Sequence, residues 1–308
     1  MSEVYAPISL PDLFLPASFG LSSVVNWITP SDTHWAGGVQ YDVDCTEVSV
    51  TLMTCISGVP SDPTPTKSVT WSHATRGARA FTVFDRADCS PVGSDWYEVG
   101  QQKVLKALTQ SGPTQLERTF WSGVSGAAPA LVYPNLTSTG PIFDDTGRIL
   151  LQPSSTLVSG VPLDVVEGLG QLENTAAACY DGELTIHVPL RIAAELEAKA
   201  LIYRDGSIIR TYCGSKVAIG RGYVSTIGPG ASTPPVGSTW MFATGPIFGI
   251  RGTPRTFSPV ESFNRSVNTV QMIAEQTFLL GWQCCLTGVL VTTGGEQAGD
   301  PLSPLQDT

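Results

Sequence analysis

The chain has 308 residues and a net charge of −10; 42% of its residues are hydrophobic and only 14% are charged. This much apolar content excludes a disordered protein, and an acidic chain without a run of lysines and arginines has no electrostatic basis for binding nucleic acid tightly. The 31 glycines and 23 prolines favour strands and turns over a helical bundle, and the low charge suits a surface covered by neighbouring proteins.

Residues 1–37 are predicted to form an extended arm. Prolines at positions 7, 11, 16 and 30 forbid a long helix and remove donors from any β-ladder. Apolar side chains in this stretch, including Phe14, Phe19 and Trp27, are costly to leave in water. We therefore expect the arm to lie either on its own domain or on a neighbouring subunit. No basic region precedes these apolar residues, so a secretory signal is not predicted.

Residues 38–58 alternate between apolar and polar side chains, which predicts a half-buried pair of strands. Residues 59–79 lack a core pattern and contain three prolines, followed by basic residues. This second stretch is typical of a protruding loop or an open hairpin. Its cations, Lys67, Arg76 and Arg79, are candidates for contact with acidic groups on another molecule.

Residues 80–84, AFTVF, alternate again and lead into a stretch from 98 to 123 that predicts a helix. Apolar residues recur there at helical spacing, first from Val104 to Leu108 and again after Pro113. A proline inside a helix removes one backbone hydrogen bond. The pattern therefore leaves two alternatives open, one long kinked helix or two helices in series.

The following part of the chain mixes helices with short strands. A loop rich in glycine, alanine and proline extends to about residue 160. Asp205-Gly206 is a turn dipeptide that predicts a small hairpin. We predict helices at 163–179 and 191–200, strands at 184–188, 217–219 and 223–227, and a loop tip at 228–237.

The C-terminal part is predicted to be rich in strands. Residues 238–252 are strand-like, whereas periodicity leaves 260–276 undecided between a helix and a long strand. Residues 277–293 form the most apolar strand material of the chain, yet they are too short and too interrupted to span a membrane. The tail from 294 onward is polar and is predicted to be loose.

Seven cysteines occur, at positions 45, 55, 89, 179, 213, 284 and 285, without any CxxC spacing. Cys284 and Cys285 are adjacent in a strand-like run, so their side chains should point to opposite faces. We interpret the cysteines as reduced, buried thiols that pack like small hydrophobic residues, and zinc binding or a disulfide framework is the alternative. Reduced thiols indicate folding in a reducing, cytosolic environment.

No catalytic, metal-binding or cofactor-binding constellation is predicted. The chain lacks HExxH, GxSxG and P-loop motifs. His187 lies in a short strand, where a core histidine with satisfied hydrogen bonds is the better interpretation. Asp144-Asp145 is best explained by a turn. An enzyme of the lyase or hydrolase class would need Asp144, Asp145 or His187 to converge in one pocket.

The order of these parts resembles the Hong Kong 97-like fold of tailed-bacteriophage major capsid proteins, a fold shared with encapsulin nanocompartments. Four stretches are also similar to capsid-type proteins of phages that infect actinobacteria: FTVF with the following C-x-PVG, ERTFWSG, CYDGELTIHVP, and FLLGWQCC-x-x-GVLV. The resemblance implies an α+β fold with an N-terminal arm, an extended loop, a spine helix in a peripheral domain, and an axial domain. Pro113 inside the spine departs from that pattern.

The resemblance also implies which residues belong to each of these parts. The arm would cover 1–37, and the first section of the peripheral domain 38–123, with the extended loop at about 56–80 and the spine helix at about 94–122. The axial domain would cover 124–237. Residues 238–293 would complete the peripheral domain and the final strand, and 294–308 would be a flexible tail.

The function that the resemblance implies is structural: a major capsid protein that self-assembles into the icosahedral head enclosing double-stranded DNA. Its partners would be many copies of itself in hexamers and pentamers, together with a scaffold, portal or decoration protein, with only weak, non-specific contact to packaged DNA and none to a membrane. It would fold and assemble in the host cytoplasm and reside in the virion capsid. Encapsulin-type shells, head–tail connectors and tail tubes are the alternatives.

Contacts between subunits are the only functional sites that we predict. Crosslinking through Lys67, the only lysine in the predicted loop, is not expected because no catalytic carboxylate accompanies it. The candidate contact residues are aromatic or basic and come from the arm, the loop and the spine helix: Phe14, Phe19, Trp27, Lys67, Trp71, Arg76, Arg79, Arg118 and Trp121.

Overall fold

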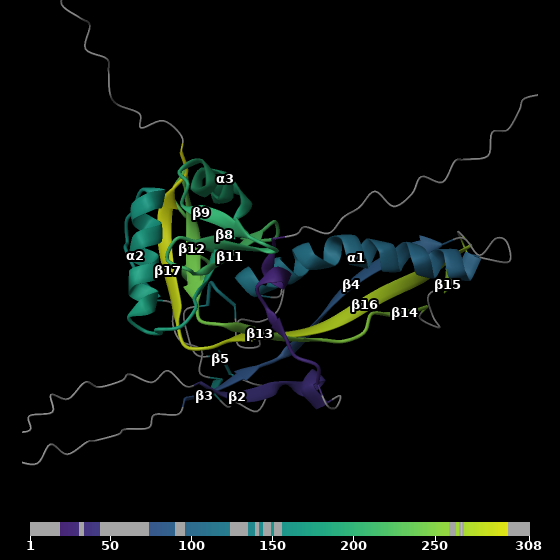
Figure 1. The fold of residues 1–308 in the computed structure, drawn as a ribbon. Coiled ribbons are helices and arrows are strands. Elements are labelled where there is room, and N and C mark those ends of the chain that lie inside the picture. The colour runs from purple at the N-terminus through teal and green to yellow at the C-terminus, as the bar shows by residue number, and fades with distance from the viewer. Residues whose placement is uncertain are drawn as a thin grey trace, which may run out of the picture.

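The structure is a computed structural model of the chain. It describes residues 19–30, 34–43, 74–89, 96–123, 135–138, 142–143, 149–150, 156–258, 263–264, 266 and 268–294. Figure 1 shows two parts: a compact part in which helices cover a sheet, and an extended part in which one long helix lies along a second sheet. Helix and sheet are thus mixed, as the α+β class requires.

The extended part is built on a six-stranded sheet. Its central strand β16 pairs antiparallel with β4 over ten residue pairs, from Val270 opposite Cys89 to Leu279 opposite Ala80. The undecided stretch before 277 is therefore a long strand. The strand material predicted at 277–293 is confirmed, but it is divided between two strands: β16 ends at Trp282 and the chain then enters the other sheet as β17 (Leu286–Thr292). The strands are β1 (Asn26–Trp27), β4 (Ala80–Cys89), β13 (Ile247–Arg251), β14 (Arg255–Phe257), β15 (Phe263–Asn264) and β16 (Thr269–Trp282).

Helix α1 (Trp96–Ser122) packs on β4 and β16 as one uninterrupted helix, so the alternative of two helices in series is excluded. Its buried residues recur every four positions and include the glycines at 100 and 112. A Cβ at Gly100 would lie 3.2 Å from Met272 side-chain atoms, so glycine lets the helix approach the sheet closely. The continuous apolar stripe outweighs the hydrogen bond that Pro113 cannot donate.

The compact part contains a seven-stranded sheet in the order β7-β17-β12-β8-β11-β10-β9. Helices α2 (Val165–Ala177) and α3 (Leu190–Ala198) pack against it, as predicted, and Asp164 caps α2 by accepting from the Val166 N–H at 2.8 Å. The predicted hairpin is confirmed: Gly206, at φ +60°, joins β9 and β10. The strands are β7 (Thr156–Leu157), β8 (Thr185–Pro189), β9 (Ile202–Asp205), β10 (Ile208–Thr211), β11 (Lys216–Gly220), β12 (Ser238–Thr244) and β17 (Leu286–Thr292).

The predicted strand at 223–227 is wrong. These residues form a turn, in which the Ile227 N–H donates to the Val224 carbonyl at 3.0 Å. Their apolar character serves a different purpose, because Tyr223 is buried and stacks on Trp121 with ring centroids 4.9 Å apart. A loop can therefore contribute core side chains without joining a sheet.

A two-stranded hairpin lies beside the extended sheet and is formed by β2 (Val39–Val43) and β3 (Ala74–Ala78) (Figure 1). The prediction of a strand early in 38–58 is confirmed, whereas its proposed partner after 44 lies outside the described residues. The alternatives for 59–79 were a protruding loop and an open hairpin; the described end of this stretch contains β3, which pairs with β2 and favours the hairpin. A further short pair joins β5 (Ile142–Phe143) to β6 (Ile149–Leu150).

The molecule has two main cores. The core under α1 is rich in aromatic side chains, with Phe120, Trp121 and Trp282 each no more than 1% exposed, and it is shared by both parts because it includes Trp240 and Phe242 of β12. The core between the helices and the seven-stranded sheet is mainly aliphatic, with Leu172 and Ile186 fully buried. Within the described ranges, no helix is long and apolar enough to cross a membrane.

Candidate functional site

The end of the N-terminal arm lies on its own subunit. The Phe19 carbonyl accepts from the Ile219 N–H at 2.9 Å, and the Arg204 guanidinium lies 4.3 Å from the centre of the Phe19 ring. Trp27 is half-buried in β1, and Arg251 lies 5.1 Å from the centre of its ring. For this segment, the open choice between its own domain and a neighbour is settled in favour of its own chain.

A buried carboxylate joins the arm to α1 and to the loop after β11. Glu117, 5% exposed, accepts from the Leu21 N–H at 3.1 Å through Oε1 and from the Gly222 N–H at 2.8 Å through Oε2. Burial raises the pKa of Glu117, and the backbone N–H groups of Gly222, Leu21 and Arg221 act in the opposite direction. One side chain therefore fixes two segments that lie about a hundred residues away on either side of it.

The backbone at Gly20 and Gly222 packs closely against α1 and the Glu117 carboxylate. A Cβ at Gly222 would lie 2.0 Å from the Thr114 carbonyl oxygen, and a Cβ at Gly20 would lie 2.2 Å from Glu117 Oε1. Glycine is therefore required at Gly222 by the approach of the backbone to α1. We call this group of residues the Glu117 junction: Gly20, Leu21, Glu117 and Gly222.

His187 is a satisfied core histidine, as predicted. Its Nδ1 lies 2.9 Å from the Tyr223 hydroxyl and its Nε2 lies 3.1 Å from Thr244 Oγ1. Complete burial lowers the pKa of His187 to about 3, so the imidazole is neutral at physiological pH. The ring centroid also lies 5.3 Å from that of Phe120 on α1. His187 thus lies where the two cores meet and serves packing.

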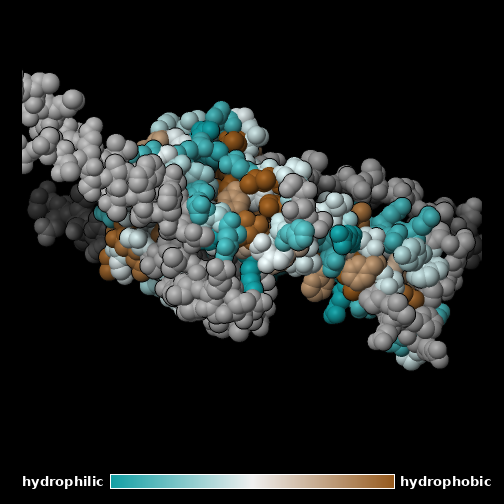
Figure 2. Space-filling view, turned by 90° about the horizontal axis from the view of Figure 1, so that it is seen from below, coloured by the Kyte–Doolittle hydropathy of each residue, from teal (hydrophilic) through white to brown (hydrophobic). Residues whose placement is uncertain are grey.

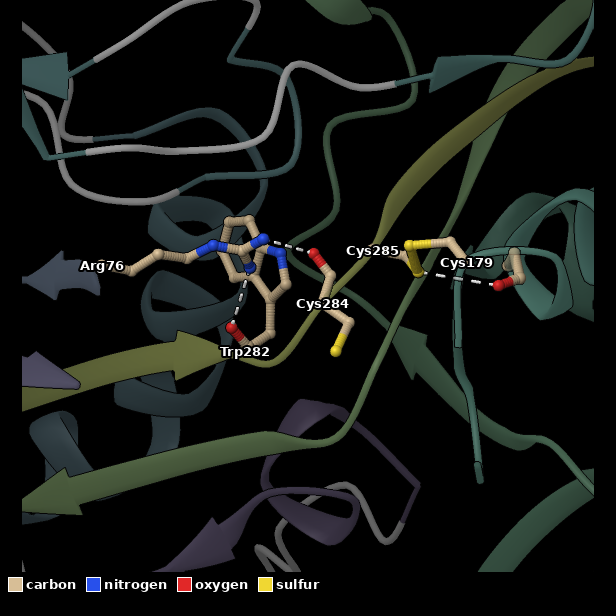
Figure 3. Close-up of a disulfide and its surroundings, with 6 residues drawn as sticks. Arg76, Cys179, Trp282, Cys284 and Cys285 are labelled. Atoms are coloured by element: carbon tan, nitrogen blue, oxygen red, sulfur yellow. Dashed lines mark hydrogen bonds between the residues drawn. A yellow bond between two sulfur atoms is a disulfide. The ribbon is translucent and has the colours of Figure 1, made fainter. Parts of the chain in front are cut away.

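The root of the β2–β3 hairpin is bonded to the end of β16. Arg76 donates to the Cys284 carbonyl at 2.6 Å and to the Trp282 carbonyl at 3.4 Å (Figure 3). The Tyr41 hydroxyl also donates to the Trp282 carbonyl, at 3.1 Å. Burial raises the pKa of Tyr41 to about 12, although the Arg76 charge opposes this shift. Burial also lowers the pKa of the Arg76 guanidinium. Arg76 was expected to meet acidic groups on another molecule; instead it bonds backbone carbonyls of its own chain.

Cys179 and Cys285 form a disulfide, which corrects the prediction of reduced thiols for this pair (Figure 3). Cys284 is disulfide-bonded as well, while Cys89 and Cys213 are free. Cys179 and Cys285 are 106 positions apart in the sequence. They meet because the chain turns between β16 and β17 at the C-terminal end of α2. Sequence spacing gives no sign of this approach.

Exposed aromatic side chains lie near the outer edge of the seven-stranded sheet, where β9 is the last strand. Tyr203 and Tyr212 are 41% and 72% exposed, and their ring centroids are 5.4 Å apart. Arg210 and Lys216 form ion pairs with Glu183 at 2.6 and 2.7 Å beside them. Such an edge offers both apolar and charged groups to another molecule.

Apolar side chains are also exposed on the extended part. Val99 and Leu105 of α1 are 55% and 39% exposed, and Phe84 of β4 is 62% exposed. A shallow cavity of about 230 Å³ lies beside the helix and is lined by Glu98, Gln101, Gln102, Leu105 and Thr256. Figure 2 shows apolar groups at separate places on the face seen from below, over both parts of the molecule.

Among the described residues, no group of three or more His, Cys, Asp or Glu side chains could together hold a metal ion. His187 is fully buried and both of its ring nitrogens have partners, so it is not available as a proton acceptor for a substrate. Asp144 and Asp145 lie outside the described residues.

Besides Phe19, Trp27 and Arg76, which are described above, the predicted contact residues fall into three groups. Phe14, Lys67 and Trp71 lie outside the described residues. Arg118 is exposed on α1, and Arg79 is half-buried beside the hairpin. Trp121 is 0% exposed and donates its indole N–H to the Ile227 carbonyl at 2.9 Å, so it is a core residue of its own subunit. Its position on the apolar stripe of α1 explains this burial.

Sequence reasoning did not identify Glu117, the internal role of Arg76, or the Cys179–Cys285 pair. One signal for Glu117 was present: the residue occupies the apolar stripe of α1, next to Leu116. A charged residue at a core position requires a buried partner. Arg76 and the cysteines carried no comparable signal, because their partners lie in the turn after β16.

A scan of protein-family models and a search of curated protein sequences found no match. Among solved structures, the chain is similar to the capsid of an empty GTA particle, with a TM-score of 0.55 and 11% identity over 94% of this chain and 95% of the other. It is also similar to the capsid of Ralstonia phage GP4, with a TM-score of 0.52 and 10% identity over 97% of both chains.

A third similar structure is the SrpI encapsulin of Synechococcus elongatus, with a TM-score of 0.54 and 12% identity over 96% of both chains. The matches cover nearly the whole of each chain, so they concern the complete architecture rather than a shared motif. The chain therefore has the Hong Kong 97-like fold, as the sequence resemblance implied.

Proposed function

We propose that this chain is the major capsid protein of a tailed bacteriophage, and that many copies, arranged in hexamers and pentamers, form an icosahedral head around double-stranded DNA. The observation that carries the proposal is the match to the capsid of the GTA particle over 94% of this chain. In this proposal the protein is structural, not an enzyme. Many modest contacts would stabilise a closed shell through multivalency, and symmetry would limit its size.

An encapsulin-type shell is the second candidate. The TM-score of 0.54 to the SrpI encapsulin is nearly the same as the score to the GTA capsid, so the fold supports both kinds of shell. The local resemblance of stretches such as ERTFWSG to actinobacteriophage capsid proteins favours the capsid. The contents of the particle distinguish the two, because a phage head encloses DNA whereas an encapsulin encloses protein cargo.

Within this proposal the compact part corresponds to the axial domain and the extended part to the peripheral domain, with α1 as the spine helix. The axial domain then includes β12 and β17, which belong to the stretch 238–293 that the resemblance assigned to the peripheral domain and the final strand. The β2–β3 hairpin forms the root of the extended loop, and residues 19–27 form the end of the arm. We propose contacts between subunits through Phe14, Lys67, Trp71, Arg79 and Arg118. The exposed Tyr203, Tyr212 and Leu105 extend this set, because large apolar side chains are costly to leave in water.

The partners in this proposal are copies of the same chain, with a scaffold, portal or decoration protein as further components. The net charge of −10 would keep packaged DNA from binding tightly to the inner surface. Assembly would take place in the host cytoplasm, and the mature location would be the virion capsid.

The test is to express the chain alone, separate the product by size exclusion, and examine it by negative-stain electron microscopy. Closed shells are the expected result. Rings or tubes would contradict the proposal and indicate a connector or tail protein. Co-expression with the neighbouring phage genes would supply a scaffold, and a chain that remains monomeric even then would overturn the proposal.

Substitutions make this test specific to the proposed contacts. Arg118→Glu reverses an exposed charge on α1 and should reduce the yield of shells while the isolated subunit keeps its melting temperature. The matched control is Arg191→Glu, which makes the same change at an exposed helical position that is not a proposed contact. Equal shell yields for both variants would remove Arg118 from the contact set.

A further inference from the structure

Two segments that pass from one sheet to the other run side by side. One segment joins β12 to β13 through Gly245 and Pro246, and the other joins β16 to β17 through residues 283–285. The Gln283 N–H donates to the Pro246 carbonyl at 3.0 Å, so the two segments are bonded to each other. We call residues 283–285 the crossover. Its position determines how the compact and extended parts are joined.

The crossover is fixed from two sides. From the hairpin, Arg76 bonds the carbonyls of Trp282 and Cys284 (Figure 3). From the compact part, the Cys179–Cys285 disulfide attaches it to the end of α2. Cys284 has φ +54°, a left-handed conformation that is unfavourable for a side chain other than glycine. Contacts on both sides of the crossover therefore hold a backbone that would otherwise relax.

The two cysteine residues differ in their exposure to solvent. Cys285 is 3% exposed, whereas Cys179, which follows α2, is an exposed residue. A soluble thiol or disulfide reagent can therefore reach the pair through Cys179. Disulfides that are accessible in this way are more readily exchanged than those enclosed in a core.

We propose that the Cys179–Cys285 pair is a thiol–disulfide exchange site through which a small-molecule disulfide, such as oxidised glutathione, locks the crossover to α2. The bond closes in an oxidising environment and opens in a reducing one. The inference concerns the subunit itself and does not require that the chain form a capsid.

The chemistry balances as two exchange steps. The Cys179 thiolate attacks the reagent disulfide, forms a mixed disulfide, and releases one thiolate that takes up the proton lost by Cys179. The Cys285 thiolate then attacks Cys179 Sγ, breaks the mixed disulfide, and releases the second thiolate, which takes up the proton lost by Cys285. Two electrons pass from the cysteine pair to the reagent, which leaves as two thiols.

The test uses the full-length chain, reduced with dithiothreitol, desalted, and then either kept reduced or treated with oxidised glutathione. Thiol alkylation followed by peptide mass spectrometry reports each cysteine. We expect Cys179 and Cys285 to be joined to each other after oxidation and alkylated after reduction, whereas Cys213, which is exposed and free, should be joined to neither of them in either state. Alkylation of Cys179 and Cys285 after oxidation would overturn the proposal.

Hydrogen exchange tests whether the bond acts as a lock. Amides of 283–286 and of the last turn of α2 should exchange about tenfold more slowly in the oxidised protein, because the crosslink suppresses local opening. Reductant alone would also open the bond of Cys284, so the decisive comparison is between oxidised wild type and oxidised Cys179→Ser. The variant should exchange at the faster rate.

Cys213→Ser is the matched control, since it removes an exposed thiol from the same part of the molecule and should leave the oxidised protein as slow as wild type. Identical exchange in wild type and Cys179→Ser would show that the bond does not lock the crossover. Size exclusion of the same samples reports assembly separately, so a failure of the lock and a failure of the capsid proposal are distinguishable.

Discussion

The compact and extended parts of this molecule are held together in different ways. In the compact part, α2 and α3 pack with the seven-stranded sheet around an aliphatic core, to which β12 and β17 contribute from later in the chain, and ion pairs such as Arg210–Glu183 lie on its surface. In the extended part, α1, β4, β16 and the end of the arm come from distant segments and meet around aromatic side chains. One of its polar contacts, between Glu117 and the Leu21 N–H, joins α1 to the arm.

The two buried carboxylates illustrate this difference. Glu173 of α2 accepts from the hydroxyls of Thr211 and Ser215, both at 2.6 Å, and both belong to the neighbouring hairpin region. Glu117 of α1 accepts from backbone N–H groups of the arm and of the loop after β11. Hydroxyls can rotate toward another acceptor, but backbone N–H groups cannot. The extended part therefore depends more strongly on single side chains than the compact part does.

The largest effect on the free energy of unfolding is expected from the protonation of His187, which lies where the two cores meet. Its folded pKa of about 3 lies below the unfolded value of 6.5. Above pH 6.5 both states are neutral and no stability is lost. As the pH falls below 6.5, the unfolded chain binds a proton that the folded chain does not, so the free energy of unfolding decreases by about 5 kcal/mol by pH 3.

Urea unfolding between pH 7 and pH 4 checks this prediction by comparing wild type with His187→Gln. Glutamine can bond both Tyr223 and Thr244 but does not titrate. The variant should therefore lose about 3 kcal/mol less than wild type over this range. Other titrating groups affect both proteins equally, so parallel pH profiles would show that His187 is protonated in the folded state or exposed to solvent.

The next largest effect on stability is expected when glutamine replaces Glu117, and the same substitution at Glu173 provides the comparison. Both carboxylate oxygens of Glu117 accept a hydrogen bond from a backbone N–H group. In Glu117→Gln one of these oxygens is replaced by an NH₂ group, which is itself a donor, so one of the two hydrogen bonds is lost. Glu173→Gln retains the single oxygen, Oε1, that accepts both hydroxyls. We expect a cost of roughly 2–3 kcal/mol for the Glu117 variant and less than about 1 kcal/mol for the Glu173 variant.

Thermal and chemical unfolding at neutral pH provide the measurement for both glutamine variants. Limited proteolysis adds a local readout, since loss of the Leu21 bond should expose the arm only in Glu117→Gln. Equal costs for the two variants would contradict the view that the extended part relies on single polar junctions.

The same difference explains how much of the structure could be predicted from the sequence. Helices α2 and α3 and the hairpin at Gly206 follow from local periodicity and a turn dipeptide, and they were predicted within a few residues. Helix α1 was also predicted, although periodicity alone could not decide whether Pro113 divides it. These are features that neighbouring residues determine.

Features that depend on distant partners were predicted poorly. The break of the chain after Trp282 and the pairing of β2 with β3 leave no periodic signal, because they depend on which segments meet in space. The same holds for the site: Trp121 was taken for a surface contact since an aromatic residue near the end of a helix suits either role. Arg76 was assigned to a neighbour because its carbonyl partners cannot be identified by residue type.

A smaller effect is expected where the hairpin joins the crossover. Arg76→Ala leaves the carbonyls of Trp282 and Cys284 without this donor and should cost about 1–2 kcal/mol, because the site is half-buried. Hydrogen exchange should increase in 39–43 and 74–78 and remain unchanged in α2 and α3. Arg118→Ala, at an exposed position, is the control and should change neither quantity. Faster exchange throughout the compact part would show that the hairpin is not a separate unit.

The smallest effect concerns the compact part, where surface charges should matter little. Asp164 both caps α2 and forms an ion pair with Lys199 at 2.9 Å, and this contact lowers the pKa of Asp164. Asp164→Asn keeps a cap acceptor but loses the charge, whereas Asp164→Ala loses both. Exposed ion pairs are screened by solvent, so the asparagine variant should be as stable as wild type, while the alanine variant should lose about 1 kcal/mol. Unfolding at low and high salt separates the two contributions: a loss in Asp164→Asn that disappears at high salt would show that surface charge stabilises this part after all.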